Sequence, residues 1–258
     1  MKIGFIGCGN MGGALAKAAK GEILLYDKNT ALAQALSAEI GAVCKGDAIE
    51  LTRCADVIFL GVKPNIVPLV LEEIKDELTG KTVVSMAAGV SIASIEAVIG
   101  SGVPVIRIMP NTPAQIGEGM ILVTKNALVG EKLLAEFLDF MKGAGRFDII
   151  DEKLIDAASA VSGCGPAFVY MFIEALADGG VKCGLPRDKA QLYAEATVRG
   201  AAALALETGK NPGVLKDAVC SPGGTTIEGV MALEKGAFRG AAMNAVCAAY
   251  EKTLKVGK

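Results

Sequence analysis

The chain opens on Lys2-Ile-Gly-Phe-Ile-Gly-Cys-Gly-Asn-Met-Gly12, and this stretch decides the fold. An apolar run of strand length leads into G-x-G-x-x-G, and a helical pattern follows. Here Gly7 allows a tight turn, Gly9 lets a pyrophosphate approach the backbone, and Gly12 lets helix and strand pack closely. The stretch predicts a dinucleotide-binding βαβ unit. The residues expected around the cofactor are Ile6, Gly7, Cys8, Gly9, Asn10, Met11 and Gly12.

An acidic residue follows at the end of the next strand pattern, Ile23–Tyr26. Asp27 lies 20 residues beyond Gly7, where a carboxylate accepts hydrogen bonds from the adenosine ribose hydroxyls. A 2′-phosphate there would meet a like charge, so Asp27 favours NADH over NADPH. The adjacent Lys28 offsets part of this preference, and a solvated loop acid is the alternative interpretation.

The first 150 residues alternate short apolar runs with amphipathic segments. Such alternation predicts an α/β fold, a Rossmann-type, mostly parallel sheet with helices on both faces. The predicted strands are Lys2–Ile6, Ile23–Tyr26, Ala42–Cys44, Val57–Gly61, Thr82–Met86, Val105–Met109, Gly119–Val123 and Phe147–Ile150. The predicted helices are Met11–Lys20, Thr30–Ile40, Ile66–Leu78, Ser91–Ile99 and Glu131–Lys142.

From residue 151 to 258 the strand-like runs disappear, and a second, all-helical domain is expected. Its predicted helices are Glu152–Gly180, Pro186–Gly209, Pro212–Val219, Thr226–Lys235 and Ala237–Val256. Stretches such as Ala194–Ala205 are rich in small residues and apolar over much of their circumference. Since so small a domain offers little interior, we expect these helices to make subunit contacts.

Composition excludes several classes of function. The net charge of −2 gives no electrostatic footprint for nucleic acid or an anionic membrane. The absence of histidine excludes His-based triads, imidazole bases and His metal sites, and we expect no metal. The longest uncharged stretch, Ala157–Ile173, contains Gly163, Gly165 and Pro166, so we do not expect it to span a bilayer. Seven scattered cysteines and no leader pattern indicate reduced thiols and a cytoplasmic protein.

Three later strand ends complete the predicted cofactor crevice, because ligands of such sheets lie outside the carboxyl ends of the strands. The residues assigned to it are Gly61, Val62, Lys63, Pro64, Ala87, Ala88, Gly89 and Asn111. For Lys63 a solvated surface lysine is the alternative, and Asn111 could equally be a turn former.

A glycine-rich loop near the end of the chain suits a small carboxylate. Ser221-Pro-Gly-Gly-Thr-Thr226 precedes an apolar helical pattern. Its glycines let backbone N–H groups approach a ligand, and a helix start adds free donors. The alternative is a hinge whose threonines only cap the helix.

With these motifs assembled, the chain resembles the pyrroline-5-carboxylate reductases over essentially its full length. The motifs that carry the resemblance are Gly7–Gly12, Val62-Lys63-Pro64, Ala87–Val90, Met109–Pro113, Ser162–Ala167 and Leu215–Glu234. It implies reduction of 1-pyrroline-5-carboxylate to L-proline, the last step of proline biosynthesis, by hydride transfer from NADPH or NADH. It also implies a helical domain that interlocks with a second subunit, an active site shared across that homodimer, and decamers in many members.

The resemblance also assigns the substrate site. The residues implied in substrate binding are Val219, Ser221, Gly223, Gly224, Thr225 and Thr226. Backbone N–H groups of this loop would hold the carboxylate, and Thr226, the implied catalytic residue, would hydrogen-bond the ring nitrogen. Two departures are Cys164, where the family usually has Ser, and Ala48, where an Asn near the ribose is common. A protonated imine is a strong electrophile, so a chain without histidine suits this reaction.

Two rival functions stay open. The β-hydroxyacid dehydrogenases share the plan but need a helix-domain lysine, and none occurs here between Lys153 and Lys182. A non-catalytic dinucleotide-binding protein would keep Gly7–Gly12 but has little reason to keep the Ser221–Thr226 loop.

Overall fold

A computed structural model describes residues 1–255, and the chain divides into two compact units. The first comprises Met1–Cys164 and the described residues from Ala249 to Lys255, and the second comprises Gly165–Ala248. Helix α7 (Glu152–Ser162) therefore belongs to the first unit, although the change of sequence pattern at residue 151 places it with the helical domain. The end of the last predicted helix, Val256, lies outside the described residues.

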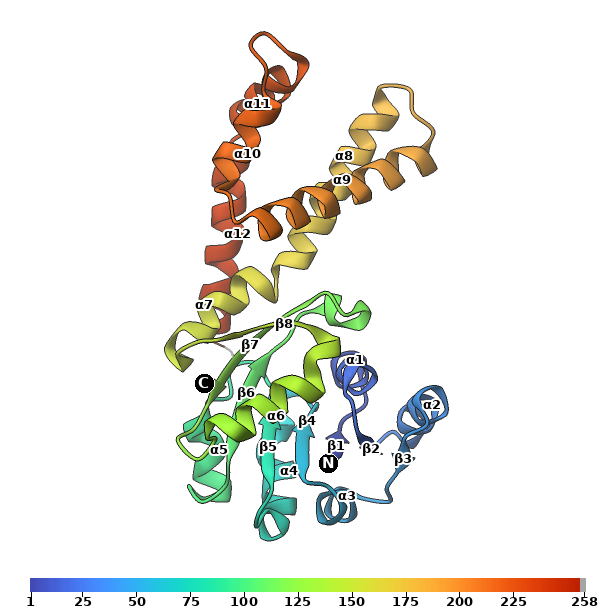
Figure 1. The fold of residues 1–258 in the computed structure, drawn as a ribbon, viewed down its shortest axis with the longest axis vertical. Coiled ribbons are helices and arrows are strands. Elements are labelled where there is room, and N and C mark those ends of the chain that lie inside the picture. Colours follow the sequence, from blue (N-terminus) through green and yellow to red (C-terminus); the bar gives the residue numbers. More distant parts are fainter. Residues whose placement is uncertain (256–258) are drawn as a thin grey trace. The chain divides into compact units, whose positions relative to one another are not determined.

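Eight strands of the first unit form one sheet in the order β3-β2-β1-β4-β5-β6-β7-β8 (Figure 1). The strands are β1 (Lys2–Ile6), β2 (Glu22–Tyr26), β3 (Val43–Cys44), β4 (Val57–Leu60), β5 (Thr82–Ser85), β6 (Val105–Met109), β7 (Gly119–Lys125) and β8 (Gly145–Ile149). Strands β1 to β6 pair in parallel, β7 runs antiparallel to β6, and β8 runs parallel to β7. The predicted Rossmann-type, mostly parallel α/β fold is confirmed.

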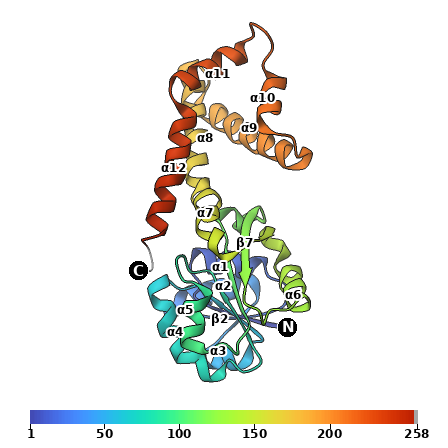
Figure 2. The ribbon, with the colours of Figure 1, turned by 90° about the vertical axis from the view of Figure 1, so that its left-hand side faces the viewer.

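Helices cover both faces of this sheet, as Figure 2 shows for α3, α4 and α5 on one side and α6 on the other. One core packs α1 (Asn10–Ala18), α2 (Thr30–Ile40) and α6 (Glu131–Met141) against the sheet. The other core packs α3 (Ala48–Cys54), α4 (Val67–Ile74) and α5 (Ile92–Ile99). Four short 3₁₀ turns lie in the connections: η1 (Pro64–Ile66), η2 (Lys75–Glu77), η3 (Thr112–Ile116) and η4 (Lys142–Ala144).

Helix α3 is an element that the sequence patterns above do not predict. It has two turns, too few for a clear period, and begins at Ala48. Its N-terminus is nevertheless stabilised by two side-chain hydrogen bonds. The Asp47 carboxylate accepts the Glu50 N–H at 2.6 Å, and the Glu50 carboxylate accepts the Gly46 N–H at 2.8 Å. This reciprocal cap explains why so short a helix forms.

The second unit consists of helices. They are α8 (Gly165–Lys182), α9 (Arg187–Thr208), α10 (Pro212–Val219), α11 (Thr225–Lys235) and α12 (Phe238–Thr253). The prediction of one helix over Glu152–Gly180 is wrong, because the helix ends at Ser162 and α8 starts at Gly165. Helices α8 and α9 bury three alanines between them, whereas α10, α11 and α12 bury no residue.

Candidate active site

The glycine loop of the first unit leaves open backbone where a pyrophosphate would lie. Gly7 has φ +102°, and a Cβ built on it would lie 2.6 Å from the carbonyl carbon of Gly61. A Cβ on Gly12 would lie 2.1 Å from the Gly7 oxygen, but a Cβ on Gly9 meets nothing within 4 Å. Gly9 is the N-cap of α1, and no side chain caps that helix. The free N–H groups and the open space at Gly9 fit a dinucleotide phosphate.

Gly61 has a packing role in this loop. A Cβ on Gly61 would lie 2.6 Å from the Gly7 oxygen and 3.4 Å from Gly12 Cα, so the end of β4 touches the glycine loop directly. Val62 and Pro64 are half-buried beyond it, and Lys63 is exposed. The structure thus brings Gly61 together with the fingerprint, and Lys63 stays available to solvent or ligand.

Asp27 is held in place by the backbone. Its Oδ2 accepts the Cys8 N–H at 2.7 Å, and its Oδ1 accepts the Asn29 N–H at 2.8 Å. Each carboxylate oxygen retains a lone pair for another donor. The half-buried carboxylate therefore fits ribose hydroxyls, and its position against the glycine loop is fixed.

Cys8 lies inside the glycine loop and is buried. Burial raises the pKa of its thiol to about 12, and the charge of Asp27 adds to this effect. The thiol therefore stays protonated near neutral pH and does not act as a nucleophile there. Its sulfur lies 3.7 Å from the Tyr26 carbonyl oxygen.

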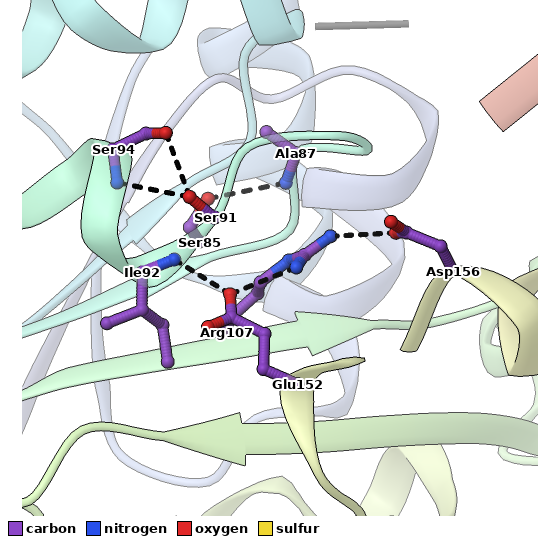
Figure 3. Close-up of polar contacts among 8 residues, drawn as sticks. All are labelled: Ser85, Ala87, Ser91, Ile92, Ser94, Arg107, Glu152 and Asp156. Carbon is purple, nitrogen blue, oxygen red and sulfur yellow. Dashed lines mark hydrogen bonds and ion pairs between the residues drawn. The ribbon is translucent and has the colours of Figure 1, made fainter. Parts of the chain in front are cut away.

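The loop after β5 borders the same edge of the sheet. Ala87 is buried, while Ala88 and Gly89 are half-buried, and Gly89 has φ +73°. The Ala87 N–H donates to Ser85 Oγ at 3.4 Å (Figure 3). At the end of the loop, Ser91 caps α5 by accepting the Ser94 N–H at 3.1 Å.

Asn111 is buried just after β6, and both ends of its amide have backbone partners. Its Oδ1 accepts the Met120 N–H at 2.9 Å, and its Nδ2 donates to the Ser162 carbonyl at 2.9 Å. The residue therefore ties the β6 loop to the end of α7. Its contact with a nicotinamide stays a prediction.

Sequence reasoning missed a buried ion-pair network beside these loops. Arg107 on β6 pairs with Glu152 and Asp156 of α7 (Figure 3). The signal that could have revealed it is a charged residue inside an apolar strand pattern, because a buried charge needs partners.

In the second unit, the Ser221–Thr226 loop consists of a turn, residues 221–224, and the first two residues of α11. Gly223 has φ +66°, and the Gly224 N–H donates to the Ser221 carbonyl at 3.1 Å. The N-cap of α11 is Gly224, and no side chain caps the helix. The alternative that the threonines cap α11 is therefore wrong. Thr225 and Thr226 are exposed in its first turn, and Val219 is exposed before the loop.

Comparison with known proteins shows which families this chain resembles. The family described as pyrroline-5-carboxylate reductase dimerisation matches residues 152–256, and the family described as NADP oxidoreductase coenzyme F420-dependent matches residues 2–89. The pyrroline-5-carboxylate reductase of Escherichia coli is 43% identical over all of this chain and 98% of that protein. The chain belongs to the pyrroline-5-carboxylate reductase family.

Other members of the pyrroline-5-carboxylate reductase family are also similar to this chain in sequence and in structure. Pyrroline-5-carboxylate reductase 3 of Danio rerio is 42% identical over all of this chain and 92% of that protein. The pyrroline carboxylate reductase of Plasmodium falciparum, solved with NADP bound, superposes with a TM-score of 0.88 at 36% identity, over all of this chain and 98% of that one.

The dimerisation match covers the helices that bury no residue within one chain. Exposed apolar side chains are frequent on them and on α9, for example Leu206, Val219 and Met243. A surface of this kind needs a partner. The protein is a homodimer-forming member of the family.

Proposed function

We propose that the protein reduces 1-pyrroline-5-carboxylate to L-proline with NAD(P)H, the last step of proline biosynthesis. The observation that carries this proposal is the full-length similarity to reductases of that name, at up to 43% identity. The dinucleotide-fitting loop at Gly7–Gly12 supports the cofactor requirement. The absence of the helix-domain lysine argues against the β-hydroxyacid dehydrogenases.

The chain's residues position the reactants. When bound, the nicotinamide supplies the hydride. The start of α1 and Gly9 would hold the pyrophosphate, and Asp27 would hold the adenosine ribose. Gly61 to Pro64, Ala87 to Gly89 and Asn111 would border the nicotinamide. The imine nitrogen takes its proton from solution, so a chain without histidine needs no imidazole acid at that nitrogen.

The Ser221–Thr226 loop binds the substrate in this proposal. Its turn offers the N–H groups of Gly223 and Thr225 to the carboxylate, with Ser221 and Val219 beside them. The Gly224 N–H already donates to the Ser221 carbonyl, so Gly224 serves by leaving room for the ligand. The Thr226 hydroxyl is not used as a helix cap, and this supports its hydrogen bond to the ring nitrogen. The active site is then shared between the subunits of the dimer.

Replacement of Thr226 tests this role. Thr226→Ala is expected to lower kcat about tenfold or more, because a positioned donor at a reacting nitrogen contributes at least that much. The Kd for NADH should change little, since Asp27 and the glycine loop hold the cofactor. Unchanged turnover at saturating imine would remove Thr226 from the mechanism.

Asp27 favours NADH over NADPH in this proposal. Two backbone N–H donors hold the carboxylate, so it cannot easily swing aside to admit a 2′-phosphate. Lys28 next to it is exposed and weakens the discrimination. The relative solved with NADP shows that the other dinucleotide suits at least one member of the family.

A steady-state assay with pyrroline-5-carboxylate and either NADH or NADPH tests both proposals. Oxidation of neither dinucleotide would contradict the reductase function. A strong preference for NADPH would contradict only the interpretation of Asp27.

The assembly and location follow the family in this proposal. Five dimers would form a decamer in the cytoplasm, and this decamer would not associate with a membrane. By length and composition the stretch Glu152–Lys182 is apolar enough to cross a bilayer. We interpret its exposed apolar side chains as subunit contacts, because the dimerisation family covers this stretch. The substrate and dimerisation domain would then run from residue 151 to 258.

A further inference from the structure

A buried arginine joins three elements of the first unit, and the mechanism above does not use it. Arg107 lies on β6 and is only 3% exposed. Its paired residues on the neighbouring strands are Ser85 and Thr124, which are also buried. A buried guanidinium is costly unless it is well paired, so its partners indicate its role.

Two carboxylates on α7, one turn apart, pair with Arg107. Nη1 donates to Glu152 Oε1 at 3.0 Å, and Nη2 donates to Asp156 Oδ1 at 3.1 Å (Figure 3). Between them Ile155 is fully buried and packs with Met109 and Leu122. Charge pairing and apolar packing together fix α7 to the sheet.

Glu152 also reaches the loop after β5. Its Oε1 accepts the N–H of Ile92 at 2.8 Å, as Figure 3 shows. Ile92 begins α5, and the loop from Ala87 to Ser91, which we assign to the nicotinamide crevice, leads directly into it. Glu152 Oε1 thus accepts from both Arg107 and Ile92. It links Arg107 to that loop as well as to α7.

Helix α7 is where the two functional regions of the chain meet. The dimerisation family begins at residue 152, yet α7 packs within the dinucleotide unit. Its far end is tied as well, because the Asn111 amide donates to the Ser162 carbonyl. Beyond Ser162 the chain turns through Gly163 and Cys164 into α8.

We propose that Arg107 is a positioning residue for hydride transfer. Through Glu152 and Asp156 it fixes α7, and with it the start of the dimerisation region, to the loop beside the nicotinamide. This inference rests on the proposed reductase function. A displacement of about 1 Å at a reacting centre can cost about a hundredfold in rate, so such a tie matters for turnover.

Stability alone explains Arg107 poorly. Among residues 1–255, its Nε is buried without a hydrogen-bond partner. Apolar replacements of buried ion pairs are often neutral or stabilising, so a costly arginine is not needed merely to fill this space. Arginine does provide a rigid fork that reaches two carboxylates at once, which lysine does not.

Single-turnover kinetics of the full-length dimer test the proposal. Arg107→Lys keeps the charge but loses the fork. Asp156→Ala removes one of the two partly exposed carboxylates and leaves the Arg107–Glu152 pair in place, so it should fold even if the first variant does not. The amplitude of NADH oxidation reports the fraction of folded enzyme. The rate constant reports how well the nicotinamide and the imine are aligned for hydride transfer. We expect the rate constant to fall about tenfold or more in both variants, while the Kd for NADH stays within about twofold.

Arg53→Lys is the matched control, because Arg53 pairs with Glu77 at 2.7 Å on the surface of the same unit. Its rate constant should equal that of the wild type. A wild-type rate constant in a folded Arg107→Lys or Asp156→Ala enzyme, with only amplitude or Tm reduced, would overturn the proposal. Absence of any wild-type turnover would instead contradict the proposed reaction, and the two failures are therefore distinguishable.

Discussion

At the scale of single residues, two glycines of the same loop have different physical roles. A Cβ on Gly12 would lie 2.1 Å from a backbone oxygen, whereas a Cβ on Gly9 meets nothing within 4 Å. Gly9 also has φ −67°, which alanine adopts without strain. Gly12 is therefore required by packing. Gly9 is required only by what approaches it from outside.

Alanine substitutions separate these roles. Gly12→Ala is expected to destabilise the protein by about 1–3 kcal/mol, because backbone atoms must move. Gly9→Ala should leave stability unchanged or slightly raised. It should nevertheless weaken NADH binding about tenfold, or about 1.4 kcal/mol, by blocking the approach of the pyrophosphate. Urea denaturation and NADH titration of both variants give the two quantities. Equal loss of stability in both would contradict the distinction.

The sequence predicts the turn at Gly7 and the close packing at Gly12, because the φ of +102° at Gly7 is local and the Gly7 oxygen against which Gly12 packs is close in the chain. It does not predict the partners of Arg107, since Glu152 and Asp156 are more than forty residues away and on an element of another predicted domain. Nor does the fingerprint reveal that the Asp27 carboxylate accepts the Cys8 N–H. Contacts of this kind depend on tertiary packing.

At the scale of elements, strong periodicity predicts well and weak periodicity does not. Helix α2 has the predicted bounds, Thr30–Ile40, because three turns of pattern end at a glycine with φ +69°. Helix α3 escapes prediction because its two turns carry little period. The break between α7 and α8 is also missed, since apolar residues continue on both sides of Gly163.

The cap of α3 is testable by Asp47→Ala. Loss of the hydrogen bond to the Glu50 N–H should cost about 1 kcal/mol of unfolding free energy. Asp76→Ala, at an exposed position of η2, is the control and should change stability by less than about 0.5 kcal/mol. Denaturant unfolding measures both. A cost for Asp47→Ala no larger than that of the control would show that packing alone forms α3.

At the scale of the whole molecule, the helical unit cannot bury its own apolar surface. Its described core is three alanines between α8 and α9, while Leu206 is 63% exposed. Leu69, on α4 of the first unit, is 65% exposed, so exposure alone does not distinguish the two residues. The dimerisation family covers Leu206 and not Leu69. The subunit contact is therefore expected to bury Leu206 and leave Leu69 in water.

Leu206→Asp should raise the dimer dissociation constant at least about a hundredfold, or about 3 kcal/mol, because an unpaired charge enters a desolvated interface. Leu69→Asp makes the same chemical change and should leave the assembly intact. Light scattering across a concentration series measures the mass of each. If the active site is shared between subunits, turnover of Leu206→Asp should fall in proportion to the dimer fraction and recover at high protein concentration. A Leu206→Asp monomer with full turnover would contradict the shared site, and an unchanged dimer would place the contact on another face of the helices.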